Sequence, residues 1–330
     1  MKLEDVARQA GVSTATVSRV LNNIGVVKIS TRARVLRTVK EMKYSPDMNA
    51  RALASGASRT IGLVVSNLAN PFFVDIYCSL EEHALGQGYE VLVAQTGYEP
   101  ERLVNAVQTM LGRRVGGLAL VVSEIDRKLL DELAERDLRT VVYDVGRPQP
   151  NMVSIKTDYR TGMQKIAEYL YGLGHRRMAF VGHHTTLGPL NDREQVFLNA
   201  MKQYSPQVTY TTVADADGFA GGHAAARALM ASGFHATAIL CVNDVMAFGV
   251  CRHLHECGLN VPGDVSVTGF DNLALAEHAC PSLTTANVPR AEIGRRMFES
   301  LTGPHSSREI TIEPQLIIRE SSGPLRQGGK

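Results

Sequence analysis

Eight short runs rich in Val, Ile and Leu recur between residues 61 and 268. They cover residues 61–65, 91–94, 118–122 and 141–143, and then 178–181, 208–213, 239–242 and 265–268. Within each group of four, a run begins 23 to 31 residues after the one before it, which leaves room for one helix. This spacing predicts βαβ units, with a parallel sheet in each of two similar lobes.

The first 43 residues have a helical period instead. Helices are predicted over residues 2–10, from Ser13 as N-cap to Leu21, and from about Ser30 to Lys43, with Gly11 ending the first. The inward-facing residues would be Leu3, Val6, Ala7 and Ala10, then Val17, Val20 and Leu21, then Val35, Leu36, Val39 and Met42. Three short helices with a Gly-containing turn between the first two match a helix-turn-helix unit.

The charge is divided unevenly between this head and the remainder. The 330 residues carry a net charge of +2, but residues 1–60 hold 11 Lys/Arg against 4 Asp/Glu, a net +7. The remaining residues hold 24 against 29, a net −5. A basic head on a mildly acidic body is typical of a nucleic-acid reader joined to a domain with another task.

The second helix has small and hydrogen-bonding residues suited to a DNA groove, namely Ser13, Thr14, Ala15, Thr16, Ser18 and Arg19. Arg19 can donate two hydrogen bonds to a guanine edge. Cations that would contact phosphates flank this helix, namely Lys28, Arg32, Arg34 and Arg37. From the pattern alone, a small helical bundle with a solvated basic face stays open as an alternative.

Longer motifs then give a family resemblance. The segments "LEDVARQAGVSTATVSRVLN" and "YSPDMNARALASGASRTIGLV" resemble the head and hinge of the lactose/galactose repressor family of bacterial transcription regulators. The resemblance continues through "NPFF", "VNDVMAFGV", "VPGDVSVTGFDN", "PSLTTANVP" and "LIIRES". It implies an α/β protein with a three-helix head, a hinge helix and two doubly wound lobes of periplasmic-binding-protein type.

The resemblance also implies a division of the chain into four parts. These are a DNA-binding head (1–45), a hinge helix and linker (46–59), an N-terminal lobe with the dimer surface (60–157 with 288–314), and a C-terminal lobe (158–287 with 315–330). In the hinge, Asn49 and Leu53 would contact DNA, and Leu53 would be wedged into a central base step of the minor groove. Lys28 stands where the family usually has Ser or Thr, so we expect Ser30 or Thr31 to cap the third helix about two residues late.

Residues that follow the predicted strands are candidates for a ligand site, because ligands bind beyond the carboxyl ends of parallel strands. They include Asp144, His183, His184, Asn243 and Asp271, with Arg193 entering a helix and Phe72 and Phe73 beginning another. The resemblance places Arg193, Asn243 and Asp271 where sugar-binding members hold their ligand, and Phe72, Phe73 and Phe219 at stacking positions, with Asp144 a less regular contact. Asp and Asn after a strand are also common helix caps, which is the plainer interpretation.

The expected effector is therefore a small polar molecule of the sugar, polyol or sugar-acid class. Leu187 and Pro189 are apolar where purine-sensing members have polar contacts, which argues against a nucleobase. The partners expected are an imperfectly palindromic double-stranded DNA operator and a second copy of the chain in a homodimer. A sugar-binding transport receptor is the alternative, but it would need a signal peptide in place of the basic head.

Other chemistry finds little support in the sequence. Cys251, His253, His255 and Cys257 cannot all bind one ion from one helix, so we predict no metal and no cofactor. No GxGxxG, GxxxxGK[ST], GxSxG or HExxH motif occurs, so we expect no enzyme. Five cysteines without a CxxC pair, and no long apolar run, predict a cytoplasmic protein without a membrane span.

Overall fold

The computed structural model describes residues 2–21, 24–44, 58–184, 189–304 and 308–325. The chain divides into two compact units, residues 1–58 and residues 59–330. None of the helices in the described ranges combines the length and apolar character that crossing a bilayer requires.

The first unit is a bundle of three helices, α1 (Leu3–Ala10), α2 (Thr14–Leu21) and α3 (Ile29–Glu41). Its core contains Val6, Val17 and Val35, which have no exposed surface. Gly11 ends α1 in the left-handed conformation with φ of 63°. The Ser13 hydroxyl accepts a hydrogen bond from the Thr16 amide (3.2 Å), which confirms Ser13 as the cap of α2.

Two expectations for α3 were wrong. The helix begins at Ile29, not two residues late, and Lys28 occupies the N-cap position without a side-chain cap. The Arg32 amide donates to the Lys28 carbonyl (2.9 Å), so Ser30 and Thr31 already lie inside the first turn.

The inward face of α3 also differs from the prediction. Leu36 is 46% exposed, whereas Thr38 is buried, with its hydroxyl donating to the Arg34 carbonyl (3.1 Å). The helical period explains this, because a residue three positions after Val35 lies nearer its face than the adjacent residue does.

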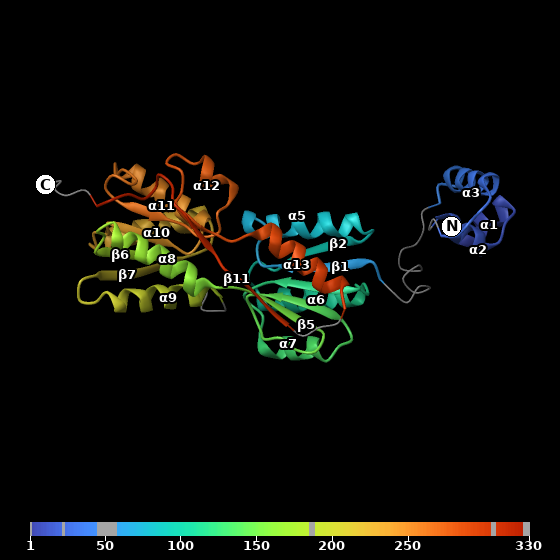
Figure 1. Cartoon of the computed structure of the whole chain (residues 1–330), viewed down its shortest axis with the longest axis horizontal. Helices are drawn as coiled ribbons and strands as arrows, with labels where there is room; N and C mark the ends of the chain where they lie inside the picture. Colours follow the sequence, from blue (N-terminus) through green and yellow to red (C-terminus); the bar gives the residue numbers. More distant parts are fainter. Residues whose placement is uncertain (1, 22–23, 45–57, 185–188, 305–307, 326–330) are drawn as a thin grey trace. The chain divides into compact units, whose positions relative to one another are not determined.

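The second unit contains two lobes, each a parallel sheet with helices on both faces (Figure 1). The N-terminal lobe has six strands in the order β11-β5-β4-β3-β1-β2. In chain order these strands are β1 (Thr60–Val65), β2 (Glu90–Gln95), β3 (Gly117–Val121), β4 (Arg139–Tyr143), β5 (Met152–Thr157) and β11 (Arg308–Ile312). Buried on both faces, β1 and β3 are almost continuously apolar, as parallel strands usually are.

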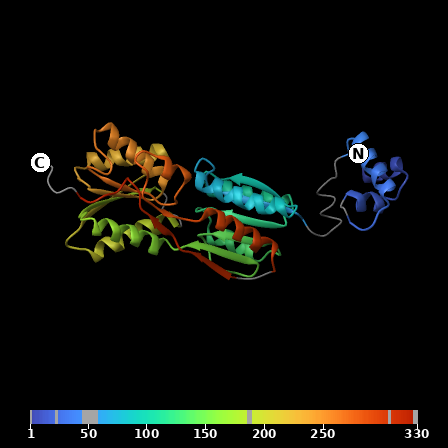
Figure 2. The ribbon, with the colours of Figure 1, turned by 45° about the horizontal axis from the view of Figure 1, so that its top comes forward.

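Four helices cover this sheet. Helices α5 (Pro71–Gly86) and α13 (Arg290–Thr302) lie on one face, and α6 (Pro100–Gly112) and α7 (Arg127–Ala134) lie on the other (Figure 1). Figure 2 shows α13 beside α5 although more than 200 residues separate them along the chain.

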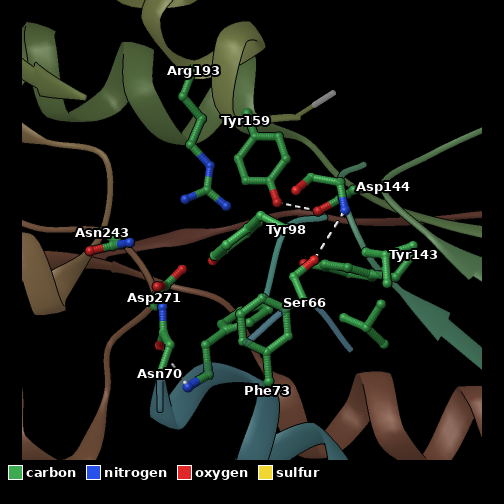
Figure 3. A pocket seen from close by; sticks show the side chains of 14 residues that line it. Ser66, Asn70, Phe73, Tyr98, Tyr143, Asp144, Tyr159, Arg193, Asn243 and Asp271 are labelled. Atoms are coloured by element: carbon green, nitrogen blue, oxygen red, sulfur yellow. Dashed lines mark hydrogen bonds between the residues drawn. The ribbon is translucent and has the colours of Figure 1, made fainter. Parts of the chain in front are cut away.

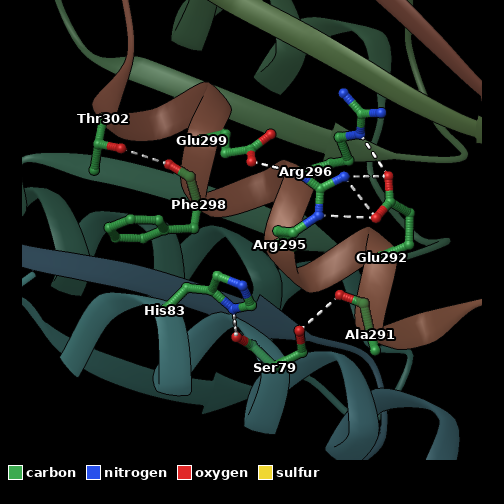
Figure 4. Close-up of polar contacts among 9 residues, drawn as sticks. All are labelled: Ser79, His83, Ala291, Glu292, Arg295, Arg296, Phe298, Glu299 and Thr302. Atoms are coloured by element: carbon green, nitrogen blue, oxygen red, sulfur yellow. Dashed lines mark hydrogen bonds and ion pairs between the residues drawn. The ribbon is translucent and has the colours of Figure 1, made fainter. Parts of the chain in front are cut away.

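Polar contacts fix α13 against α5. The Ser79 hydroxyl donates to the Ala291 carbonyl (2.7 Å), and an added Cβ at Gly294 would lie 2.7 Å from the Ile76 carbonyl oxygen. On the outer side of α13, Glu292 accepts hydrogen bonds from Arg295 and Arg296 (Figure 4). A C-terminal segment is thus an integral part of the N-terminal lobe.

The C-terminal lobe repeats the design with four parallel strands in the order β7-β6-β8-β9. Its strands are β6 (Arg177–His183), β7 (Thr209–Asp215), β8 (Ala238–Cys241) and β9 (Ser266–Thr268). Its helices are α8 (Tyr159–Gly172), α9 (Pro189–Gln203), α10 (Phe219–Ala231), α11 (Asp244–Glu256) and the short α12 (Ala274–His278). Helices α8 and α9 lie on one face and α10 and α11 on the other (Figure 1).

The chain passes between the lobes near three points. It leaves the N-terminal lobe after β5, returns through β10 (Thr285–Asn287) to α13 and β11, and leaves again through β12 (Gln315–Ile317). Strands β10 and β12 pair antiparallel, with Ala286 opposite Leu316. The order of strands reverses between β1 and β3 in one lobe and between β6 and β8 in the other. Such reversal points are where ligands bind in open parallel sheets.

Candidate functional site

The head presents one side of α2 to solvent. Ser13, Thr14, Ala15 and Arg19 are exposed and Thr16 and Ser18 are half-buried, while Val17 and Val20 face the core. Lys28, Arg34 and Arg37 are exposed, and Arg32 is half-buried. The predicted DNA-contacting residues of the head are thus at least partly exposed. Asn49 and Leu53 lie outside the described residues.

A pocket lies between the two lobes, at the carboxyl ends of their strands (Figure 3). The empty space between its walls amounts to about 500 Å³, part of it open to solvent. The N-terminal lobe contributes Ser66, Asn70, Phe72, Phe73, Tyr98, Val121, Val122, Ser123, Tyr143 and Asp144, and the C-terminal lobe contributes Tyr159, Arg193, Asn243 and Asp271. Six of the seven predicted effector-contacting residues thus line one cavity.

Arg193 is the cation of this pocket. Its side chain is 6% exposed, and its guanidinium lies over the rings of Tyr159 (4.2 Å) and Phe270 (5.0 Å). One nitrogen, Nη1, donates to the Val242 carbonyl (2.7 Å), whereas Nε is buried without a hydrogen-bond partner among the described residues. Burial alone would lower the pKa of Arg193, but the nearby Tyr159 and Asp271 raise it, so the group stays charged.

Asp271 supplies a matching unpaired acceptor. Its Oδ1 atom is buried and has no partner within the described part of the chain, while its backbone carbonyl accepts from Arg290. Burial raises the pKa of Asp271 well above its ordinary value, Arg193 lowers it, and Asp244 raises it again. A buried donor and a buried acceptor without partners are groups that a polar ligand can satisfy.

Asn243 is both a helix cap and a pocket residue. Its side-chain oxygen accepts from the Met246 amide (2.8 Å), capping α11, and its Nδ2 donates to Asp217 (3.0 Å). The side-chain oxygen of Asn243 is therefore a helix cap, as the plainer interpretation of the sequence predicted. Its amide nitrogen belongs to a polar cluster at the edge of the cavity.

Asp144 is held firmly by the protein. Its Oδ1 accepts from the Thr157 amide (2.6 Å), and its Oδ2 accepts from the Tyr159 hydroxyl. Burial raises the pKa of Asp144 to about 6, although the hydrogen bonds from Tyr159 and Thr157 oppose that rise. With both oxygens engaged, Asp144 orients Tyr159 in the cavity wall.

Three pocket residues have positive φ angles. Tyr98, Asp144 and Asp271 have φ angles of 66°, 58° and 119°, in a region that residues with a side chain rarely adopt. Each such residue costs about 1–3 kcal/mol, and strain of this kind is typical of sites where function fixes side-chain direction. All three side chains line the cavity.

Of the three phenylalanines predicted to stack on the effector, two line the pocket. Phe72 and Phe73 line the pocket and contact each other edge to face, with centroids 5.6 Å apart. Phe219 is absent from the wall, contrary to expectation: it is 51% exposed and stacks on Phe248 (6.1 Å). Gly218, with φ of 102°, turns the chain into α10 so that Phe219 packs along α11. His183 is half-buried and does not line the pocket, although its ring lies 5.2 Å from that of Tyr98, and His184 is exposed.

Sequence reasoning missed Tyr98, Tyr159 and Asp217. Tyr98 and Asp217 follow β2 and β7, so the rule that selected Asp144 and Asn243 applies to them as well. Tyr159 begins α8 directly after the N-cap Asp158, where a buried aromatic residue could have been suspected.

Comparisons with known proteins agree with this arrangement. Residues 2–47 match the model of bacterial regulatory proteins of the lacI family, and residues 167–322 match that of the periplasmic binding protein-like domain. The chain is 32% identical to the HTH-type transcriptional repressor PurR of Photobacterium profundum, covering 97% of this chain and 98% of that protein. The PurR repressor of Vibrio vulnificus is 31% identical over the same shares of both chains.

Solved structures give the same result. The lac repressor dimer bound to operator and the anti-inducer ONPF superposes with a TM-score of 0.84 at 27% identity, covering 98% of this chain and 99% of that one. The complex of the transcriptional regulator CelR with cellobiose gives a TM-score of 0.69 at 28% identity, covering 98% and 100%. These relatives are regulators rather than enzymes, and they share the head, both lobes and their order. The chain therefore belongs to the lacI family of bacterial regulatory proteins.

Proposed function

We propose that this chain is a transcriptional repressor that binds an imperfectly palindromic operator as a homodimer. A small polar effector that enters the pocket between the lobes raises or lowers its affinity for that operator. The observation that carries the proposal is the unpaired Arg193 Nε and Asp271 Oδ1 at the junction of two lobes, in a chain that also carries a helix-turn-helix head.

The DNA-binding half of the proposal rests on the surface of α2. Its small exposed residues let the backbone approach a major groove, and Arg19 extends from the same side. The exposed cations Lys28 and Arg34 favour contact with phosphates. The relatives that match over the full length are named repressors, and the matched lac repressor is described as an operator-bound dimer.

The effector half rests on the chemistry of the cavity. A carboxylate oxygen and a guanidinium nitrogen without partners suit hydroxyl or carboxylate groups of a ligand, and Phe73 and Tyr98 offer rings to its apolar face. This combination favours a sugar, polyol or sugar acid. A planar nucleobase is the competing class, because aromatic side chains line much of the same cavity.

The effector signal would reach the DNA-binding head through a movement of the two lobes. The N-terminal lobe (60–157 with 288–314) would move against the C-terminal lobe (158–287 with 315–330). Ligand bound to both lobes favours their closure, and closure would shift the N-terminal lobes of the dimer and the hinge at 46–59. Asn49 and Leu53 in that hinge, together with Arg19 in the head, would then change their contacts with DNA.

A thermal-shift screen of the purified chain tests the effector class. Sugars, polyols, sugar acids and nucleobases are compared, because a ligand that binds only the folded state raises the unfolding midpoint. We expect a hit among the hydroxyl-rich compounds that disappears in Asp271→Asn and persists in His184→Gln, an exposed neighbour outside the cavity wall. A hit confined to nucleobases would contradict the proposed class.

Selection of duplexes from a random pool tests the regulatory role. A regulator enriches one imperfect palindrome, and the effector then changes its affinity for that duplex. A transport-type receptor without a DNA role would bind ligand but enrich no sequence.

A further inference from the structure

Helices α10 and α11 of the C-terminal lobe pack with their backbones in contact. An added Cβ at Gly222 would lie 2.0 Å from the Met246 carbonyl oxygen, and one at Gly249 would lie 2.1 Å from the Phe219 carbonyl oxygen. Glycine is required at both positions because no side-chain atom fits there. This close approach brings side chains of the two helices together beside the glycines.

His223 of α10 meets two residues of α11 in this way. Its Nε2 lies 2.7 Å from Glu256 Oε2, and its ring packs edge to face on that of His253 with centroids 4.7 Å apart. Possible ligand atoms of His223, His253 and Glu256 all lie within 4.8 Å of one another. Around a tetrahedral zinc ion, ligand atoms lie about 3.4 Å apart, a spacing between the 2.7 Å of the His223–Glu256 contact and the 4.8 Å limit for all three.

His253 gives the second, independent observation. The residue is 9% exposed, and its Nδ1 is buried without a hydrogen-bond partner among the described residues, while Nε2 lies 3.6 Å from Cys257 Sγ. The unused nitrogen of a buried imidazole is an atom that a metal ion can take as a ligand.

Glu256 adds a charged oxygen. Its carboxylate accepts hydrogen bonds from His223 and Arg252, each at 2.7 Å. Arg252 occupies Oε1 (2.7 Å), which leaves Oε2 on the side of the histidines. An ordinary surface ion pair accounts for His223 and Glu256, but it leaves the buried nitrogen of His253 unexplained.

We propose that His223, His253 and Glu256 form a site for a divalent transition-metal ion of the zinc class, bridging α10 and α11 on the outside of the C-terminal lobe. Two imidazoles and one carboxylate suit zinc and its neighbours, whereas calcium and magnesium prefer oxygen ligands alone. The site lies outside the wall of the pocket between the lobes, so the inference does not depend on the effector.

Calorimetric titration of the reduced, tag-free full chain with zinc chloride tests this site. We expect one ion per chain, and a loss of affinity of at least about tenfold in His223→Gln and in Glu256→Gln. Both residues are partly exposed, so these variants should fold, which circular dichroism checks. The ion should also raise the unfolding midpoint of the parent chain but not of His223→Gln.

Two matched controls separate this site from other thiols and imidazoles. His255→Gln changes a residue of the same helix that lines a different hollow with Cys251 and Cys280, and Cys257→Ser removes the thiol beside His253. Both should keep zinc binding within a factor of about three. The proposal is overturned if no zinc binds, or if binding survives in His223→Gln and is lost in either control.

Discussion

The Tyr98 hydroxyl donates to Asp217 across 2.9 Å and thereby joins the N-terminal lobe to the C-terminal lobe beside the pocket. Asn67 of the N-terminal lobe donates to the same carboxylate oxygen (3.3 Å), and Asn243 of the C-terminal lobe donates to the other (3.0 Å). Burial raises the pKa of Tyr98, and the charge of Asp217 raises it further, so the phenol remains a donor. Asp217 is thus a single acceptor shared by both lobes.

We expect this contact to couple the lobes measurably. Tyr98→Phe and Asp217→Asn should each reduce the free energy of unfolding in urea, and the double variant should lose about 1 kcal/mol less than the sum of the two. A second cycle pairing Asp217→Asn with Tyr171→Phe, whose hydroxyl bonds Gln207 within the C-terminal lobe, should be additive. Additivity in both cycles would show that the Tyr98 contact does not link the lobes in solution.

In the head, Arg19 and Arg37 should behave differently. Arg19→Ala should weaken binding to the selected operator by about 1–3 kcal/mol and binding to random duplex much less, because a base contact is lost. Arg37→Ala should weaken both by similar amounts and reduce the salt dependence, because a phosphate contact is lost. Fluorescence anisotropy at several salt concentrations measures both. Equal losses on the two duplexes for Arg19→Ala would remove its base-reading role.

Asp144 predicts a pH dependence of stability. Its pKa is about 6 in the folded chain against about 3.8 in an unfolded chain, so the folded state binds the proton more tightly. Stability from this group is therefore gained as the pH falls through 6 and lost as the pH rises through 6. Between pH 7 and pH 5 the gain is on the order of 1 kcal/mol.

Asp144→Asn isolates this contribution. The amide oxygen can still accept from the Thr157 amide, and the new NH2 group can donate to the Tyr159 oxygen with the direction of that bond reversed, but the side chain cannot ionise. Urea unfolding at a series of pH values should therefore show a free-energy difference between parent and variant that changes between pH 7 and pH 5. A difference that is constant over this range would mean that Asp144 has an ordinary pKa.

The eight strands expected from Val, Ile and Leu runs all occur. In strands such as β1, β3 and β8, nearly every residue is buried, and such strands must be apolar, which makes them visible in the sequence. β5 and β11 were not among the expected strands. They contain Ser154, Lys156, Arg308 and Glu309, and Lys156 and Glu309 form an ion pair across the two strands (2.6 Å). Charged residues on the edge strand β11 and on its neighbour β5 interrupt the apolar runs that would identify these strands.

Part of the pocket could be predicted from the sequence, because the carboxyl ends of parallel strands meet at one edge of the sheet. What could not be read was the direction of each side chain after the strand. Tyr98 has a left-handed backbone, and the turn at Gly218 lets Phe219 of α10 stack on Phe248 of α11. Both features depend on loop geometry rather than on residue type. Likewise, the residues around Cys251 lie on one helix and are visible as a cluster in the sequence, whereas His223 lies 30 residues before His253.

The glycines between α10 and α11 give the last prediction. Gly249→Ala should reduce the free energy of unfolding by about 1–3 kcal/mol, because its Cβ would overlap the Phe219 carbonyl and the His223 amide. The matched control is Gly86→Ala near the end of α5, where an added Cβ meets nothing within 4 Å. Since alanine restricts the unfolded chain more than glycine, that variant should be stabilised by about 0.5–1 kcal/mol. If Gly249→Ala were as stable as the parent chain in urea, the two helices could not be packed with their backbones in contact, and the approach of His223 to His253 would lose its structural basis.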